Sequence, residues 1–346
     1  MKPVRVLVID DSATMRAFIR GAMSAEPGIE VVGEAGDPLE AREAIKALSP
    51  DVLTLDVEMP NMNGIDFLER LMRLRPMPVI MISTLTQKGA ETTLDALELG
   101  AFDCIGKPGH GNPGAAFVGL TEKILAAAKA RVRPSEPNRA PPQRQSDYKV
   151  GDKVLAIGSS TGGVEALQTL LTSFPEHCPA TIITQHMPPT FTRHFAERLD
   201  RICAPRIFEA FEGAPIVPGT VYIAPGGNAH LEVSGRVGAL RCHLAEGETV
   251  SGHRPSVDVM FSSVTRMVGA RAVGVILTGM GRDGAKGLLA MRQAGASTLG
   301  QDEATCVVFG MPKAAHEAGA VEKLLPLGRI GPAALSLCAA QARGIK

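Results

Sequence analysis

Short apolar runs alternate with amphipathic segments along most of the 346-residue chain. Short apolar runs bounded by glycine or charged residues are typical of buried strands, and apolar residues spaced three and four apart are typical of helices. In the first part of the sequence the pattern predicts strands at Val4–Ile9, near Val31, at Val52–Leu55, at Val79–Ile82 and near Phe102–Ile105. It predicts helices at Thr14–Met23, Leu39–Leu48, Ile65–Leu74, Thr92–Leu99 and Phe117–Ala128. This alternation indicates an α/β fold, a doubly wound (βα)5 parallel sheet.

The same alternation returns in the second part of the sequence and predicts another, mainly parallel, doubly wound α/β sheet. The predicted strands are Val154–Ile157, Thr181–Thr184, Val221–Ile223, Ala272–Leu277 and one near Ser297–Leu299. The predicted helices are Val164–Leu171, Thr190–Arg201, Ser256–Met267, Ala285–Ala294, Pro312–Ala318 and a carboxyl-terminal one within Ala333–Lys346. Shorter strands around His230 to His243 suggest an antiparallel excursion.

The stretch between the two sheets is rich in proline, charge and amides and has no apolar period. Such a segment buries too little apolar surface to fold alone, which predicts a linker. We therefore expect a first domain at 1–125, a linker at 126–152 and a second domain at 153–346.

Composition narrows the function classes. Lysine plus arginine and aspartate plus glutamate both number 36, so the formal net charge is zero. This balance argues against nucleic acid or an anionic membrane as the main partner, because both favour basic surfaces. The six cysteines are scattered with no C-x-x-C pair, and no apolar run approaches the ~18 residues of a membrane span. We expect a monomeric cytoplasmic protein with no membrane insertion.

Polar residues follow the strands of the first predicted sheet. Asp10 and Asp11 follow the first strand, Asp56 ends the third, Ser83 follows the fourth and Lys107 follows the fifth. Because the carboxyl ends of parallel strands meet at one edge, these side chains should share a crevice. Clustered carboxylates repel one another, and Mg²⁺ relieves that repulsion with oxygen ligands. A free carboxylate there can accept a phosphoryl group as an acyl phosphate.

The second sheet carries a candidate nucleophile and its partners. Ser160 is central in Gly158-x-Ser160-x-Gly162, a tight turn between a strand and a helix. His186 follows the second strand, and Asp283 follows the strand that ends near Leu277. A serine hydroxyl needs an imidazole to accept its proton and a carboxylate to orient that imidazole. Three strand ends at one edge can assemble that triad.

Two alternatives compete with this interpretation. Gly279-x-Gly281-x-x-Gly284, with Asp302 further on, mimics a dinucleotide-binding fingerprint, but such a site normally opens its domain. A lipase-type hydrolase would place its triad in the order serine, aspartate, histidine, whereas here histidine precedes aspartate.

Residues 1–125 resemble a response-regulator receiver domain. The matching stretches are Val8-Ile-Asp10-Asp11-Ser, Asp56-Val-Glu-Met-Pro-Asn-Met-Asn-Gly64 and Lys107-Pro108. The resemblance implies that Asp56 is the phosphoacceptor and that Mg²⁺ is held by Asp10, Asp11, Asp56 and the backbone carbonyl of Glu58. It also implies that Ser83 is the switch hydroxyl and Lys107 the phosphate partner. On the fifth strand, Cys104 occupies the position where many receivers have a switch aromatic residue. A signalling route that depends on the rotamer of that aromatic is therefore not expected here, whereas phosphorylation itself is unaffected.

Receiver, linker and second domain together resemble the bacterial chemotaxis protein-glutamate methylesterases, the CheB family. The matching blocks are Ala156–Gly163, Ile183–Pro188, Gly219–Gly226, His253–Val259, Leu277–Gly284 and Gln301–Pro312. The resemblance implies a phosphorylation-activated hydrolase that demethylates receptor glutamates, releases methanol and deamidates receptor glutamines. Its implied partners are a histidine kinase as phosphodonor and methyl-accepting chemoreceptors as substrate.

The family also implies roles for individual residues of the second domain. Ser160 would be the nucleophile, His186 the general base and Asp283 its orienting carboxylate. The Met280 backbone N–H would stabilise the oxyanion with assistance from Thr161, and ester hydrolysis would need no cofactor. The alternative from another class is a response regulator whose second domain only binds a ligand or dinucleotide.

Overall fold

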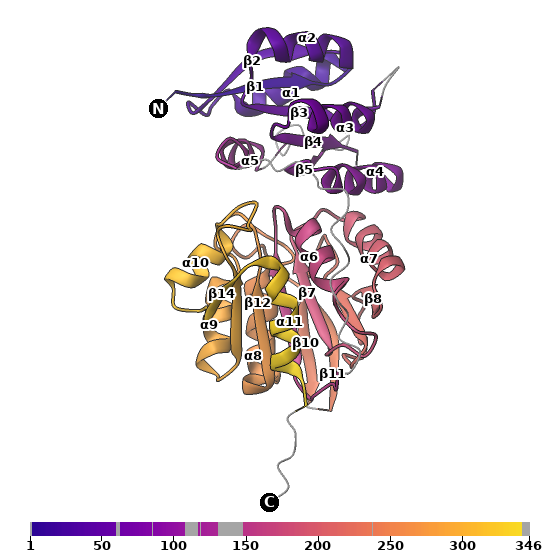
Figure 1. Cartoon of the computed structure of the whole chain (residues 1–346), viewed down its shortest axis with the longest axis vertical. Helices are drawn as coiled ribbons and strands as arrows, with labels where there is room; N and C mark the ends of the chain where they lie inside the picture. The colour runs from indigo at the N-terminus through magenta and orange to yellow at the C-terminus, as the bar shows by residue number, and fades with distance from the viewer. Residues whose placement is uncertain are drawn as a thin grey trace, which may run out of the picture. The chain divides into compact units, whose positions relative to one another are not determined.

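The structure is a computed structural model that describes residues 2–59, 63–84, 86–107, 117, 119–130, 148–236 and 238–340. It forms two compact units, Met1–Asn138 and Arg139–Lys346. Most of the predicted linker (131–147), residues 60–62 of one receiver stretch, Pro108, and residues 341–346 of the predicted final helix lie outside the described residues. The cartoon in Figure 1 labels many of the helices and strands of both units.

The first unit contains a five-stranded parallel sheet in the order β2-β1-β3-β4-β5, so the predicted fold class is confirmed. Its strands are β1 (Val4–Ile9), β2 (Ile29–Ala35), β3 (Val52–Asp56), β4 (Val79–Ser83) and β5 (Asp103–Gly106). Its helices are α1 (Ala13–Met23), α2 (Pro38–Leu48), α3 (Gly64–Leu74), α4 (Gln87–Glu98) and α5 (Leu120–Ala127). Helix α4 begins before the predicted start at Thr92, because Thr86 caps its first turn by accepting from the Gly89 N–H.

Every residue of β3 and β4 is buried, as expected for central strands of a sheet covered on both faces. Their register places the strand ends side by side. Ile9 pairs with Leu55, and Asp56 pairs with Ile82. Asp10 and Asp56 therefore lie next to each other at the carboxyl edge.

The second unit contains a seven-stranded parallel sheet in the order β14-β13-β12-β6-β7-β9-β8. Its strands are β6 (Val154–Ser159), β7 (Thr181–Gln185), β8 (Arg206–Glu209), β9 (Thr220–Ile223), β12 (Ala272–Ile276), β13 (Ser297–Gln301) and β14 (Lys323–Leu325). The helices are α6 (Gly163–Leu171), α7 (Phe191–Ile202), α8 (Val257–Met267), η2 (Gly269–Arg271), α9 (Ala285–Gln293), α10 (Met311–Glu317) and α11 (Leu327–Cys338). The predicted antiparallel excursion is the hairpin of β10 (Ala229–Arg236) and β11 (Ala239–Glu246).

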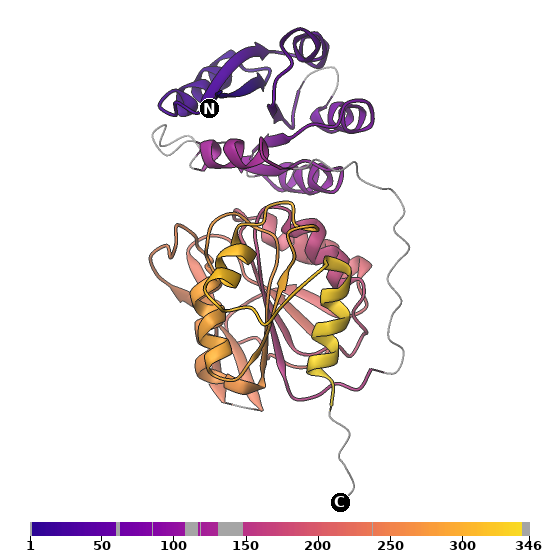
Figure 2. The same ribbon diagram turned by 60° about the vertical axis from the view of Figure 1, so that its left-hand side comes forward.

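Helices cover both faces of this sheet. Helices α6 and α11 pack together on one face, and α8 and α9 pack together on the other (Figure 2). The central strands place two predicted site residues at the same edge. Ser159 on β6 pairs with Gln185 on β7, so Ser160 and His186 directly follow paired residues.

Further details in the second unit differ from the sequence-based predictions. Strands β8 and β14 escaped prediction. They are edge strands of four and three residues, which are too short to show a recognisable alternation of apolar and polar positions. Helix α11 begins at Leu327, earlier than the predicted segment Ala333–Lys346, although Gly331 and Pro332 disfavour a helix at this place. The helix instead accommodates Pro332 and buries an apolar face, which shows that tertiary packing outweighs local propensity there.

Candidate functional site

The turn that carries Ser160 requires glycine on both sides. A Cβ at Gly158 would lie 2.2 Å from a methyl carbon of Val257, so β6 and α8 could not pack as closely as they do. Gly162 has φ +77°, a left-handed conformation that side chains disfavour. The Ser160 backbone is held by its N–H, which donates to Thr278 O at 3.0 Å. The turn therefore presents Ser160 in a fixed position at the carboxyl edge of the sheet.

His186 and Asp283 meet at the same edge. His186 Nε2 lies 2.8 Å from Asp283 Oδ2, and both side chains are almost completely buried. The other ring nitrogen, His186 Nδ1, is buried and has no hydrogen-bond partner among the described residues. No hydrogen bond joins it to Ser160 in the part of the chain that the structure describes. Asp283 therefore occupies Nε2, and Nδ1 is the ring nitrogen without a partner among the described residues.

Asp283 is fixed by the first turn of α8. Its Oδ1 accepts from Ser256 Oγ at 2.8 Å and from Asp258 N at 3.0 Å, and its Oδ2 accepts from Val257 N at 2.7 Å. Burial by itself would raise the pKa of Asp283, but the His186 hydrogen bond and charge and these N–H donors hold the pKa below its usual value. The carboxylate therefore stays ionised beside the imidazole. The sequence predicted Asp283 as the carboxylate that orients His186, and the structure adds that Asp283 also accepts from the Val257 and Asp258 N–H groups at the start of α8.

The predicted oxyanion residues flank Ser160. A Cβ at Gly279 would lie 2.8 Å from Ser160 Cβ, so the Gly279–Met280 backbone runs against the serine. The Met280 N–H has no acceptor among the described residues, whereas Gly279 O accepts from the N–H of Met311 at 2.8 Å. Thr161 is buried, and its carbonyl accepts from Thr278 Oγ1 at 3.0 Å. The turn after β12 is thus held next to Ser160.

Two nearby residues were missed as site residues. Ser256 and His253 lie in the block His253–Val259, which carries the family resemblance, but the sequence placed neither of them in the catalytic site; it offered His253 only as a positive charge toward acidic receptor helices. Ser256 holds Asp283, and the ring of His253 stacks on the ring of His186. A serine followed by an amphipathic helix was the available signal for the cap, but its bond to Asp283 depends on tertiary structure.

The acidic cluster of the first unit gathers as predicted. One carboxylate oxygen from each of Asp10, Asp11 and Asp56 lies within 4.8 Å of the others. Lys107 Nζ lies 3.0 Å from Asp10 Oδ2 and 2.8 Å from Asp56 Oδ2. Ser83 Oγ donates to backbone carbonyls, at 3.1 Å to Gly89 O.

The chemistry of this cluster fits a hard divalent cation. Burial raises the pKa of Asp56 to about 6, the Asp10 charge adds to the rise, and Lys107 opposes it. Three crowded carboxylates offer the oxygen ligands that Mg²⁺ prefers. The Glu58 N–H donates to Asp56 Oδ1 at 3.3 Å, which places the Glu58 backbone at the rim of the cluster.

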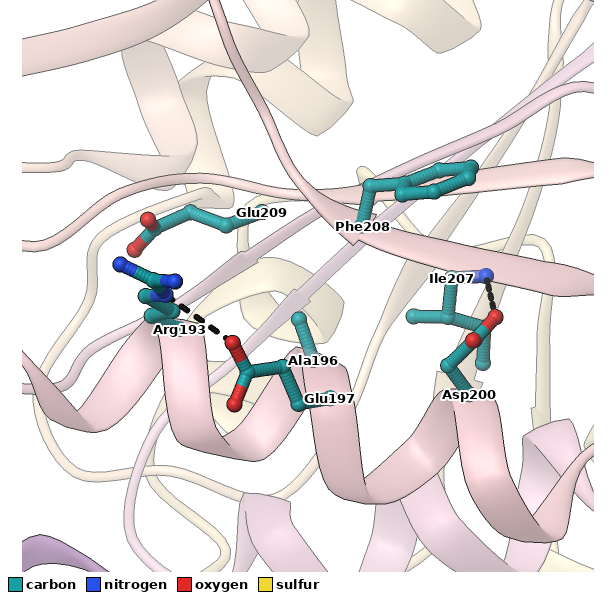
Figure 3. A pocket seen from close by; sticks show the side chains of 7 residues that line it. All are labelled: Arg193, Ala196, Glu197, Asp200, Ile207, Phe208 and Glu209. Atoms are coloured by element: carbon teal, nitrogen blue, oxygen red, sulfur yellow. Dashed lines mark hydrogen bonds and ion pairs between the residues drawn. The ribbon is translucent and has the colours of Figure 1, made fainter.

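A groove of about 380 Å³ lies between α7 and β8 (Figure 3). It is lined by Arg193, Ala196, Glu197, Asp200, Ile207, Phe208 and Glu209. Its charged groups already have protein partners: Arg193 Nε donates to Glu197 Oε1 at 2.9 Å, and Ile207 N donates to Asp200 Oδ1 at 2.8 Å. None of the predicted triad residues lines this groove, so the candidate site lies elsewhere. Among the described residues, no helix is both long and apolar enough to cross a membrane.

Two family models match the chain. Residues 155–334 match the family described as CheB methylesterase, and residues 6–113 match the response regulator receiver domain. The catalytic domain of Thermotoga maritima CheB methylesterase is a similar solved structure, with 37% identity and a TM-score of 0.52. That match covers 54% of this chain and 98% of the Thermotoga chain.

Curated relatives match over nearly the whole length. A protein-glutamate methylesterase/protein-glutamine glutaminase 1 of Rhizobium johnstonii is 61% identical over 344 residues, which cover 99% of each chain. The protein of the same name in Caulobacter vibrioides is 61% identical over 345 residues, covering 99% of this chain and 100% of the relative. A relative from Bordetella pertussis is 51% identical over 336 residues, covering 95% and 96%.

Proposed function

Because this chain belongs to the CheB methylesterase family and joins that domain to a receiver domain, we propose that it hydrolyses glutamate methyl esters on chemoreceptors. The observation that supports the proposal best is the buried 2.8 Å pair of His186 and Asp283 beside the Ser160 turn. An alternative in which the second domain only binds a ligand is not favoured, because the curated relatives are named as hydrolases.

In the first half of the reaction, Ser160 Oγ attacks the carbonyl carbon of the ester and passes its proton to His186 Nδ1. Asp283 stabilises the resulting imidazolium through Nε2. The tetrahedral intermediate collapses when His186 returns the proton to the departing methoxy oxygen, which leaves as methanol. A glutamyl group then remains bound to Ser160 as an ester.

In the second half, His186 accepts a proton from water as the water attacks the acyl-enzyme, and Ser160 recovers its proton. The Met280 N–H stabilises the oxyanion of both tetrahedral intermediates, with Thr161 beside it. The loss of one such donor typically lowers kcat by roughly 10²–10³-fold. The same steps would deamidate a glutamine, with ammonia as the leaving group.

The receiver domain would regulate this reaction. Asp56 accepts a phosphoryl group from a chemotaxis histidine kinase, and Asp10, Asp11, Asp56 and the Glu58 carbonyl would hold Mg²⁺. When bound, Mg²⁺ neutralises the clustered carboxylates and the phosphoryl oxygens. Lys107 already lies 2.8 Å from Asp56, where it can pair with the new phosphate. Ser83 would exchange its carbonyl acceptors for a phosphate oxygen.

The test is methanol release from methylated receptor membranes by the full chain, with and without acetyl phosphate and Mg²⁺. We expect Ser160→Ala to abolish release, and Asp56→Asn to keep only the release seen without the phosphodonor. Ser234→Ala, in the hairpin, is the matched serine control and should behave as wild type. Release by Ser160→Ala at the wild-type rate would reject the triad, and activation of Asp56→Asn would reject the phosphoacceptor.

A further inference from the structure

The imidazole rings of His186 and His253 lie face to face. Their centroids are 3.7 Å apart, and the angle between their planes is 11°. The His186 side chain is only 7% exposed, and one edge of its ring is bound to Asp283. A single hydrogen bond at Nε2 fixes the position of that nitrogen but does not fix the plane of the ring, which can still turn about the Cβ–Cγ bond of His186. The stacked ring of His253 removes that freedom.

His253 is itself held from both sides. Val250 and His253 exchange two backbone hydrogen bonds of 3.0 Å, which close a tight turn. On the other side, the Arg254 guanidinium donates to Gly227 O at 2.9 Å and also bonds to Gly247 O. Both bonds tie the Arg254 guanidinium to backbone carbonyls of neighbouring segments. The loop is therefore fixed on both sides of His253, which holds the His253 ring in place against His186.

A buried histidine on β10 completes the attachment. His230 Nδ1 accepts from the Ser256 N–H at 3.1 Å, and His230 Nε2 lies 2.8 Å from Glu248 O. Because a neutral imidazole donates from one nitrogen only, these bonds select the tautomer with the proton on Nε2. His230 thus joins the start of the loop to Ser256, whose hydroxyl holds Asp283. One network fixes both the carboxylate and the stacked ring.

We propose that His253 is a positioning residue for the hydrolysis: its ring fixes the plane of His186, so that Nδ1 meets the Ser160 hydroxyl while Nε2 stays on Asp283. This proposal rests on the function proposed above. His253 gains and loses no proton in the reaction, so a flat aromatic ring without a titrating group should replace it. General orientation effects are large, since small misplacements of reacting groups can cost about 10²-fold in rate.

The kinetic test compares His253→Ala and His253→Phe in the full chain, measured by methanol release with the phosphodonor present. We expect His253→Ala to lower kcat by about 10- to 100-fold with KM within about twofold, and His253→Phe to stay within about threefold of wild type. His177→Ala, an exposed histidine outside this network, is the matched control. Wild-type kcat in His253→Ala, or an equal loss in both variants, would overturn the proposal.

A second readout does not depend on the reaction. In the full chain labelled at histidine, a stacked ring shifts the His186 proton resonances by its ring current. We expect His253→Ala to abolish this shift and His253→Phe to retain it, whatever the activity or thermal stability of the variants. Unchanged His186 resonances in His253→Ala would refute the positioning role. If Ser160→Ala releases methanol like wild type, the proposed function fails, and the resonance test still decides whether His253 orients His186.

Discussion

His186 Nε2 and Asp283 Oδ2 lie 2.8 Å apart although 97 positions separate the residues in the sequence. Because Nε2 is taken by the carboxylate, Nδ1 is the nitrogen left for the serine. In chymotrypsin-type triads the two nitrogens have the opposite roles. In the proposed triad the carboxylate therefore binds Nε2 and the serine uses Nδ1. This arrangement depends on the rotamer of His186 as well as on the presence of a histidine.

Replacing Asp283 with asparagine should remove the charge that stabilises the His186 imidazolium while nearly preserving side-chain shape. We expect kcat to fall by roughly 10³–10⁴-fold with little change in KM, as for other triads that lose their carboxylate. Methanol release measures this directly. Asp152→Asn, an exposed aspartate in the same unit, should retain wild-type kcat, and a loss below about tenfold in Asp283→Asn would contradict an orienting role.

The lowered pKa of Asp283 also predicts a pH dependence of stability. A carboxyl group whose pKa is lower in the folded than in the unfolded state adds stability above its unfolded pKa, near 3.9, and loses it as the pH falls through the folded value. The difference in free energy of unfolding between wild type and Asp283→Asn should therefore shrink between about pH 5 and pH 3. Urea unfolding at both pH values tests this, and a constant difference would contradict it.

Ser256 serves two groups through one hydroxyl. It donates to Asp283 Oδ1 at 2.8 Å and accepts from Val259 N at 3.4 Å as the cap of α8. Ser256→Ala should lower the free energy of unfolding by about 0.5–2 kcal/mol, as cap removal does. It should also lower kcat by about tenfold, which corresponds to about 1.4 kcal/mol.

A cap elsewhere separates these two effects. Asp37→Ala removes the cap of α2, where Asp37 Oδ1 accepts from Leu39 N at 2.7 Å. Thermal unfolding should show a loss comparable to that of Ser256→Ala, whereas methanol release should be retained. Equal kcat in both variants would show that Ser256 does not support Asp283.

Mg²⁺ should stabilise the receiver domain through the Asp10, Asp11 and Asp56 cluster. At a free concentration ten times Kd, a ligand of the folded state adds about 1.4 kcal/mol. We expect Mg²⁺ to raise the Tm of wild type but not of Asp10→Asn, with Glu30→Gln, an exposed acidic residue on β2, as the control. Because the pKa of Asp56 is raised to about 6, Mg²⁺ affinity should increase between pH 5 and pH 7 as this carboxyl ionises. Equal stabilisation of Asp10→Asn would place the ion elsewhere.

Gly162 should tolerate no side chain. Its φ is +77°, and an added Cβ would lie 2.6 Å from Val307 Cβ. Gly213 has φ +76° with open space around it, so Gly213→Ala carries the backbone strain without the clash. Gly213→Ala should cost about 1–2 kcal/mol of stability, and Gly162→Ala should cost more and lower kcat by moving Ser160. If urea unfolding shows the same loss of free energy of unfolding in both variants, the close approach of Val307 to Gly162 does not add to the cost.

The sequence by itself determined the two doubly wound sheets, because apolar runs and amphipathic spacing are local patterns. It also determined the candidate residues, since Asp56, Ser160 and His186 lie at or shortly after the ends of predicted strands. Parallel strands bring their carboxyl ends to one edge, so position at a strand end is enough to predict that such residues gather.

Only the tertiary structure decided how these residues are held. The 2.8 Å bond from Ser256 to Asp283 and the 3.7 Å stack of His253 on His186 join segments far apart in the chain. No periodicity encodes such contacts, because they depend on the order of the strands and on the path of a loop. The short edge strands β8 and β14 and the start of α11 escaped prediction for the same reason: neighbours in space, rather than in sequence, stabilise them.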